Sequence, residues 1–162
     1  MKSLPGLHLR PTPDRLRETL FDILAPRIEG AVFADLYAGS GAVGIEALSR
    51  GAAGAVFVEK HRPAVDVIRQ NLTALGIEGR AQVIAGKATT PLGRLKADIV
   101  FLDPPYDLES EYDAVLRALG EAPPPLVIAQ HSTRLALKEE YGKLRRVRLV
   151  KQGDNVLSFF EP

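Results

Sequence analysis

The chain has 162 residues, 46% hydrophobic and 25% charged, which is the balance of a folded globular protein and excludes a disordered chain. It contains no cysteine, which excludes disulfide scaffolds, cysteine nucleophiles and cysteine-ligated metal clusters, and its three histidines are scattered, so we expect no metal site. No apolar run approaches the ~20 residues of a membrane span and no signal sequence begins the chain, so we expect a cytoplasmic protein without membrane contact.

The net charge of +1 conceals a basic segment near the C-terminus. Residues 134–151 hold seven basic and two acidic side chains, a local charge of +5. This cluster favours a polyanionic partner, although a solvated strand face explains it equally well. Strand alternation predicts that Arg146 and Arg148 share one face there.

The first predicted element is a helix that begins at Thr12-Pro13-Asp14, which supplies an N-cap, a proline in the first turn and an acidic residue. An apolar stripe follows at helical spacing, and Pro26 with Gly30 is expected to end the helix. Arg17 and Phe21 lie off this stripe, which indicates a nucleic-acid contact or, alternatively, packing on a second helix. The stripe consists of Leu16, Leu20, Ile23 and Leu24.

Beyond this helix, short apolar strands alternate with amphipathic helices. We predict strands at 31–36, 55–58, 81–84, 97–102 and 126–129, and helices at 42–49, 63–75 and 110–119. The strands 144–150 and 155–160 flank Gly153-Asp154, which is typical of a hairpin turn. The pattern predicts an α/β fold with a mostly parallel sheet and helices on both faces. We expect one structural domain, with an N-terminal segment and helix at 1–30 and the main unit at 31–162.

A glycine-rich segment, Ala38-Gly39-Ser40-Gly41, follows the first strand and precedes a helix. Glycine allows a ligand to approach the backbone closely, and a helix N-terminus offers N–H groups, so the segment indicates a nucleotide-type cofactor site. A tight structural turn would produce the same pattern.

Two carboxylates favour S-adenosylmethionine over NAD as the cofactor. Glu59 ends the second strand, where it would bind ribose hydroxyls, and follows Gly44 by 15 residues rather than the ~20 usual for a dinucleotide fold. Asp35 ends the first strand, where a carboxylate would attract a cationic ligand and repel a pyrophosphate.

The most specific motif is Asp103-Pro104-Pro105-Tyr106, at the end of a strongly apolar strand. Two prolines fix two φ angles and make the corner rigid. Asp103 and the Pro104 carbonyl would accept hydrogen bonds from an exocyclic amino group, and Tyr106 would stack on its ring. The corner therefore predicts binding of a planar group that carries an exocyclic amino group.

Together these motifs resemble those of S-adenosylmethionine-dependent methyltransferases that modify amino groups of bases. The segments 10–21, 35–41 and 46–52 make the chain similar to the bacterial RsmD type, which methylates N2 of a guanine in 16S ribosomal RNA. The resemblance runs from about Arg10 to the end of the chain. It implies a Rossmann-like, seven-stranded methyltransferase sheet with an antiparallel last strand.

The resemblance also implies roles for individual residues. Asp103, Pro104 and Tyr106 would form the catalytic corner of a monomeric enzyme acting on 16S rRNA or the assembling small ribosomal subunit. The expected cofactor-binding residues are Asp35, Ala38, Gly39, Ser40, Gly41, Glu59, Lys60 and Ala88. The expected RNA-binding residues are Arg10, Thr12, Arg15, Arg17 and Phe21.

The chain departs from the family pattern at two places. Only nine residues precede Arg10, where relatives carry a longer basic segment, and Lys87 stands where the third cofactor strand usually ends in an acid. The alternative functions are N6-adenine methylation of DNA, an NAD-dependent oxidoreductase and a non-catalytic RNA-binding subunit. The absence of a target-recognition domain argues against the first, and the intact Asp-Pro-Pro-Tyr corner argues against the last.

Overall fold

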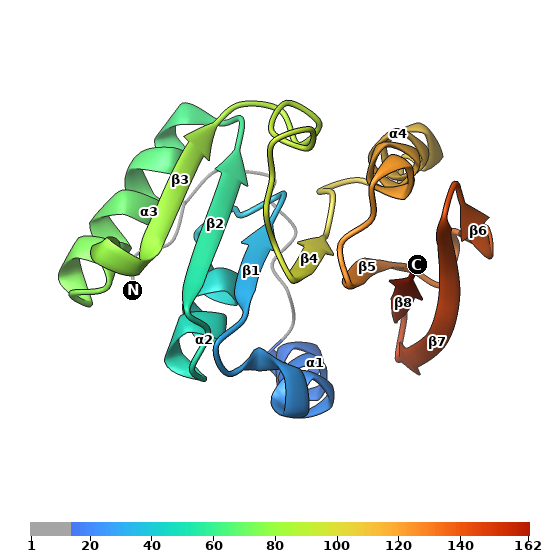
Figure 1. Cartoon of the computed structure of the whole chain (residues 1–162), viewed down its shortest axis with the longest axis horizontal. Helices are drawn as coiled ribbons and strands as arrows, with labels where there is room; N and C mark the ends of the chain where they lie inside the picture. Colours follow the sequence, from blue (N-terminus) through green and yellow to red (C-terminus); the bar gives the residue numbers. More distant parts are fainter. Residues whose placement is uncertain (1–13) are drawn as a thin grey trace.

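The computed structural model describes residues 14–162, and the predicted site residues Arg10 and Thr12 lie outside this range. Eight strands form one sheet in the order β3-β2-β1-β4-β5-β8-β7-β6 (Figure 1). The strands are β1 (Val32–Asp35), β2 (Gly54–Glu59), β3 (Ala81–Ala85), β4 (Ile99–Leu102), β5 (Leu126–Ser132), β6 (Glu140–Tyr141), β7 (Leu144–Gln152) and β8 (Asn155–Glu161).

Strands β1 to β5 are parallel, and β8 is antiparallel to both β5 and β7. This confirms the predicted α/β sheet with an antiparallel last strand. The two-residue strand β6 is additional, and it pairs only with the start of β7. Because β1 to β5 all point the same way, their carboxyl ends meet at one edge of the sheet, which we call the carboxyl edge.

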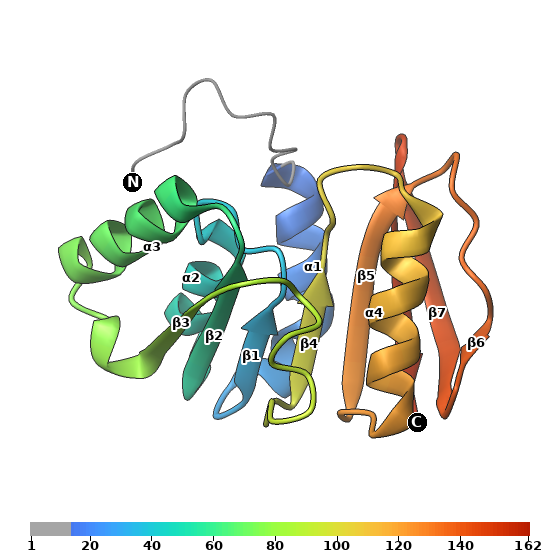
Figure 2. The ribbon, with the colours of Figure 1, turned by 90° about the horizontal axis from the view of Figure 1, so that it is seen from above.

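Four α-helices cover the two faces: α1 (Asp14–Ile28), α2 (Ala42–Ser49), α3 (Arg62–Ala74) and α4 (Glu109–Glu121). Figures 1 and 2 show α1, α2 and α3 on one face, and α4 on the other. Side chains alternate accordingly: Phe33 and Phe101 pack on the α1 face, whereas Ala34 and Leu102 pack on the α4 face. A short 3₁₀ helix, η1 (Glu78–Arg80), precedes β3.

The predicted end of the first helix at Pro26 and Gly30 is confirmed, because α1 includes Pro26 and ends at Ile28, two residues before Gly30. Proline lacks a backbone N–H donor, but here it lies in the last turn, where little of the helix follows. The buried side chain of Ile28 packs in the core and favours this extension. Gly30, with φ of 77°, then turns the chain toward β1.

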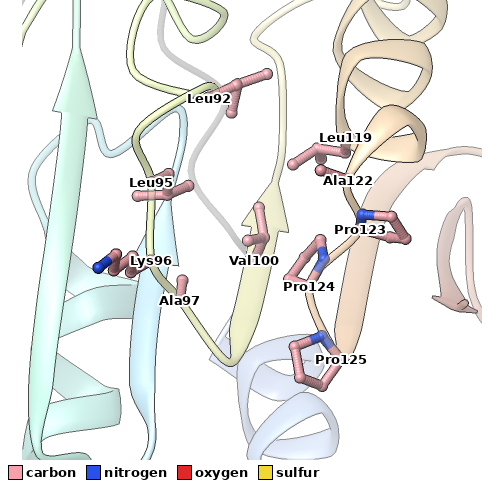
Figure 3. Close-up of a pocket in the computed structure, with 10 residues that line it drawn as sticks. All are labelled: Leu92, Leu95, Lys96, Ala97, Val100, Leu119, Ala122, Pro123, Pro124 and Pro125. Carbon is pink, nitrogen blue, oxygen red and sulfur yellow. The ribbon is translucent and has the colours of Figure 1, made fainter.

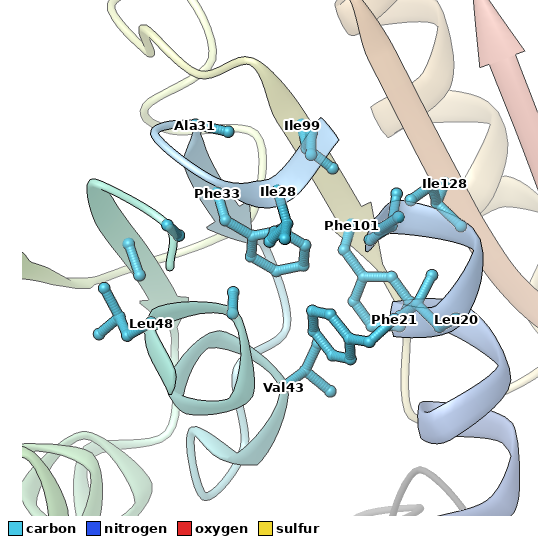
Figure 4. Close-up of a cluster of buried hydrophobic side chains, with 14 of the residues drawn as sticks. Leu20, Phe21, Ile28, Ala31, Phe33, Val43, Leu48, Ile99, Phe101 and Ile128 are labelled. Atoms are coloured by element: carbon cyan, nitrogen blue, oxygen red, sulfur yellow. The ribbon is translucent and has the colours of Figure 1, made fainter. Parts of the chain in front are cut away.

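The interpretation of Phe21 as an RNA contact is also wrong, because its side chain is fully buried (Figure 4). Its ring centroid lies 5.9 Å from that of Phe33, and the Arg50 guanidinium lies 5.5 Å from its centroid. Helix α1 packs on α2 as well as on the sheet, so its buried arc is wider than the leucine stripe alone. The alternative prediction, that this face of the helix packs against a second helix, is confirmed.

A register shift in β7 corrects the prediction for the basic hairpin. Arg146 pairs with Phe160 and Arg148 with Phe159, although these two phenylalanines face opposite sides of the sheet. The irregularity at Val147 therefore places Arg146 on the α4 face and Arg148 on the α1 face, where its guanidinium lies 5.9 Å from the Phe159 ring.

A cavity of about 250 Å³ lies on the α4 side near the starts of β4 and β5 (Figure 3). It is lined by leucines of α4 and of the 86–98 loop, and by Pro123, Pro124 and Pro125, which lead into β5. It is thus remote from the carboxyl edge. Within residues 14–162, no helix is long and apolar enough to cross a membrane.

Candidate active site

Three carboxylates gather at the carboxyl edge on the α1 face of the sheet. Asp35 ends β1, Glu59 ends β2 and Asp103 follows β4, and these strands are neighbours in the order β2-β1-β4. All three residues are largely buried, with exposed fractions of 2%, 7% and 8%. The sheet topology therefore brings together three acidic residues that the sequence separates by up to 68 positions.

Burial raises the pKa of Asp35 from its ordinary value of 3.8 to about 8. The hydrogen bond that its carboxylate accepts from the Tyr37 N–H, at 3.1 Å, opposes this rise, and the nearby carboxylates of Asp103 and Glu59 add to it. A buried carboxylate beside two others is stabilised in its charged form by a cation. The site is thus electrostatically suited to a positively charged ligand.

Backbone geometry explains the glycines between β1 and α2. Gly39 and Gly41 have φ values of 57° and 90°, a left-handed region that favours glycine. Gly44 serves a different purpose: a Cβ at this position would lie 2.3 Å from the ring of Phe57. Its hydrogen side chain lets α2 pack closely on β2, the role of the third glycine in nucleotide-binding turns.

Glu59 holds the glycine turn in place. Its Oε1 accepts a hydrogen bond from the Gly39 N–H at 2.9 Å, and its Oε2 accepts one from the His61 N–H at 2.9 Å. Each carboxylate oxygen can accept further bonds, so both remain suited to ribose hydroxyls. The two backbone contacts fix the orientation that such binding requires.

The Asp103–Tyr106 corner combines a buried carboxylate with an exposed aromatic ring. Asp103 and Pro104 are buried, whereas 57% of Tyr106 is exposed. The Tyr106 carbonyl accepts a hydrogen bond from the Leu108 N–H at 2.8 Å, which shapes the turn leading into α4. An exposed ring beside a buried acceptor fits a planar ligand that is stacked and hydrogen-bonded at its edge.

Two contacts that the sequence analysis missed support these loops. The buried side chain of Asn71, on α3, donates a hydrogen bond to the Ser40 carbonyl at 3.1 Å. The Tyr37 hydroxyl bonds to the Glu111 carboxylate in the first turn of α4, which connects the glycine turn to the segment after Tyr106. Their partners lie 31 and 74 residues away, so no local pattern could have revealed them.

The other predicted site residues lie around this centre. Lys60 is exposed directly after Glu59, and the Ala88 side chain is buried in the α4-face core. Arg15 is exposed on the first turn of α1, while Arg17 is paired with Asp14 at 3.1 Å and lies 3.8 Å from Glu46. Arg15 is therefore the more exposed of the two arginines.

The donor set fits S-adenosylmethionine better than a dinucleotide. In its ionised form, the buried carboxylate of Asp35 suits a sulfonium and an ammonium group and would repel a pyrophosphate. Glu59 would bind the ribose, and the turn at Gly39 and Gly41 would lie against the methionine end. Within the described chain, no group of three or more histidine, aspartate or glutamate side chains is arranged to hold a metal ion.

Comparison with known proteins agrees with this architecture. The family described as Conserved hypothetical protein 95 matches residues 1–161. A Bacillus subtilis protein named as an rRNA methyltransferase, YlbH, is 34% identical over 157 residues, which cover 91% of this chain and 85% of that protein. Ribosomal RNA small subunit methyltransferase D of Escherichia coli K12 is 48% identical over 104 residues, which cover 63% of this chain and 51% of that enzyme.

Solved structures show the same fold. The Escherichia coli protein yhhF, described as a methyltransferase, has a TM-score of 0.84 and 32% identity, with 94% of this chain and 87% of that one covered. An RNA methyltransferase from Salinibacter ruber, in complex with S-adenosyl-L-homocysteine, has a TM-score of 0.75 and 20% identity, with 94% of each chain covered, and this likeness concerns the fold alone. With its sequence match from end to end and its motifs at the carboxyl edge, the chain belongs to the RsmD-type family of ribosomal RNA methyltransferases.

Proposed function

We propose that the protein transfers a methyl group from S-adenosylmethionine to the exocyclic N2 of a guanine in 16S ribosomal RNA. The observation that carries this proposal is the buried Asp103 carboxylate in the Asp-Pro-Pro-Tyr corner, beside the buried Asp35 and Glu59. The similarity to ribosomal RNA small subunit methyltransferase D supports small-subunit ribosomal RNA as the substrate class. The match covers about half of that enzyme, so substrate and partner are part of the proposal.

Asp35 and Glu59 position the cofactor. Asp35, whose pKa of about 8 leaves it protonated in the protein alone, becomes ionised beside the cationic end of the ligand, and Glu59 accepts hydrogen bonds from the ribose. When bound, S-adenosylmethionine supplies a methyl group that its positive sulfur has already activated. The protein therefore contributes chiefly proximity and electrostatic orientation.

The Asp103–Tyr106 corner prepares the amino group. The guanine N2 is a weak nucleophile because its lone pair is delocalised into the ring. Hydrogen bonds from the two N2–H groups to Asp103 and to the Pro104 carbonyl would favour a pyramidal nitrogen, which is the form that attacks a methyl donor. Tyr106 stacks on a base that has turned out of its own helix or loop.

Proton transfer completes the reaction. As the N2–C bond forms and the C–S bond breaks, N2 becomes positively charged and loses one proton. Asp103 accepts this proton directly or through a water molecule. Both roles require the carboxylate at this one position.

The test is methylation with labelled S-adenosylmethionine of four substrates: naked 16S rRNA, assembled small ribosomal subunits, transfer RNA and duplex DNA. Nuclease digestion and chromatography then identify the methylated nucleoside. We expect N2-methylguanosine at one position of 16S rRNA or of the assembled subunit. Label in N6-methyladenosine, or in DNA alone, would refute the proposal.

Asp103→Ala tests the role of the corner, because this proposal places Asp103 against the base rather than the ribose. We expect this variant to lose methyl transfer by ~10²–10³-fold or more, the usual effect of removing a preorganised hydrogen-bond partner. Its affinity for the cofactor should stay within a few-fold of wild type. Near-normal turnover would contradict the proposed role of the corner.

A further inference from the structure

Gln130 is a buried polar side chain that the site described above does not use. It is the fifth residue of β5, and it is completely inaccessible to solvent. Neither its Nε2 nor its Oε1 has a hydrogen-bond partner among residues 14–162. Buried polar groups in native proteins are almost always paired, so an amide with both atoms unpaired calls for a functional explanation.

The sheet register places Gln130 beside the catalytic corner. The pairing of β4 with β5 ends at Leu102 and Ala129, and Asp103 and Gln130 are the next residues along the two chains. Ile128, two positions earlier on β5, belongs to the α1-face core, so alternation directs Gln130 to that face. It thus lies on the same face of the sheet and at the same level as Asp103.

The two side chains together offer a specific hydrogen-bonding pattern. The carboxylate of Asp103 accepts, the Oε1 of Gln130 accepts and its Nε2 donates. The edge of guanine presents the complement in the same order: N2–H donates, N1–H donates and O6 accepts. Adenine cannot match it, because its N1 is an acceptor beside the N6 amino group.

We propose that Gln130 determines the specificity of the enzyme for guanine, an inference that rests on the proposed function. Its Oε1 accepts a hydrogen bond from N1–H and its Nε2 donates one to O6, while Asp103 accepts from N2–H. The geometry thereby separates two tasks: Asp103 binds the amino group that is methylated, and Gln130 recognises the ring that carries it.

Gln130 is closed to solvent, so the base reaches it only if the side chain turns toward Asp103, which has an exposed fraction of 8%. This movement breaks no hydrogen bond, because the amide has no partner in the described chain. A buried amide that is unpaired before the base enters and paired afterwards makes guanine binding more favourable, since the cost of leaving the amide unpaired is removed on binding.

The test compares guanine with 2-aminopurine at the mapped target position of the RNA. 2-Aminopurine has the same N2 amino group but lacks both O6 and N1–H. The expected preference of the wild-type enzyme for guanine, as the ratio of kcat/KM values, is about 10- to 100-fold, the range for one bidentate base contact. Gln130→Met has a side chain of similar length without the amide, and its ratio should fall close to one.

Gln152→Met is the matched control. Gln152 lies on β7, two strands from β5, and its Nε2 donates a hydrogen bond to the Thr19 hydroxyl at 3.1 Å. One of its polar atoms, Oε1, is likewise buried and unpaired among the described residues. The Gln152→Met substitution should leave the preference for guanine over 2-aminopurine unchanged.

Thermal unfolding separates specificity from simple packing. Gln130→Met should raise Tm, because the substitution removes an unpaired buried amide. A raised Tm with an unchanged preference for guanine would overturn the proposal and make Gln130 a core residue only. If Gln130→Met does not fold, the wild-type enzyme alone tests the proposal. A kcat/KM ratio near one between guanine and 2-aminopurine would then overturn it. Failure of the wild type to methylate either base would instead refute the proposed function.

Discussion

The charge state of Asp35 gives a prediction that can be tested without any RNA. The pKa of this buried carboxyl rises to about 8, so the folded protein keeps Asp35 protonated at neutral pH, whereas the unfolded chain ionises near 3.8. Between these two values the folded state binds more protons than the unfolded state. Linkage then requires the free energy of unfolding to fall as the pH rises from about 4 to 8, and to level off above.

The magnitude follows from this interval. Each pH unit within it lowers the free energy of unfolding by up to ~1.4 kcal/mol, so the loss between pH 5 and pH 7 is about 2–3 kcal/mol. Asp35→Asn removes the ionisation but keeps an oxygen that can accept the bond from the Tyr37 N–H. Between pH 5 and pH 7, the free energy of unfolding of Asp35→Asn should therefore fall by about 2–3 kcal/mol less than that of the wild type.

Urea denaturation of both proteins at pH 5, 6, 7 and 8 measures this difference. His131, whose burial lowers its pKa, contributes with the opposite sign, but it is present in both proteins and cancels when they are compared. Saturating S-adenosylmethionine should flatten the wild-type dependence, because its positive charge stabilises the ionised carboxylate. Parallel pH profiles for wild type and Asp35→Asn would refute the reasoning.

Three further predictions concern the rest of the site. Glu59→Gln should weaken cofactor binding by ~1.5–3 kcal/mol in calorimetry while RNA affinity is retained, and unchanged cofactor affinity would contradict the ribose role. Tyr106→Ala should lower kcat/KM by the equivalent of ~1–3 kcal/mol of stacking, whereas Tyr106→Phe should not, so equal losses would argue against stacking. Gly44→Ala should destabilise the fold by ~1–3 kcal/mol, because its Cβ would lie 2.3 Å from the Phe57 ring, and an unchanged urea midpoint would show that α2 can shift.

Local patterns in the sequence were sufficient to predict the sheet and the acidic residues that gather at its carboxyl edge. Strand and helix periodicity depend on residues a few positions apart, and alternating strands and helices leave few topologies besides a mostly parallel sheet. Because such a sheet aligns its carboxyl ends, the residues that end its strands share one edge. Asp35, Glu59 and Asp103 could thus be assigned to a common site from the sequence, and the structure brings them together.

Other features depend on packing between distant segments, and only the tertiary structure decided them. Phe21 is buried because α1 packs on two elements at once, which a single helical stripe does not show. The register shift in β7 separates Arg146 from Arg148, because an extra residue reverses strand alternation. Gln130 belongs to the same class: its position beside Asp103 is set by the pairing of β5 with β4, and its unpaired amide by everything that surrounds it. Sequence periodicity reports which face a residue takes within one element, whereas burial and pairing depend on the neighbouring elements that the fold supplies.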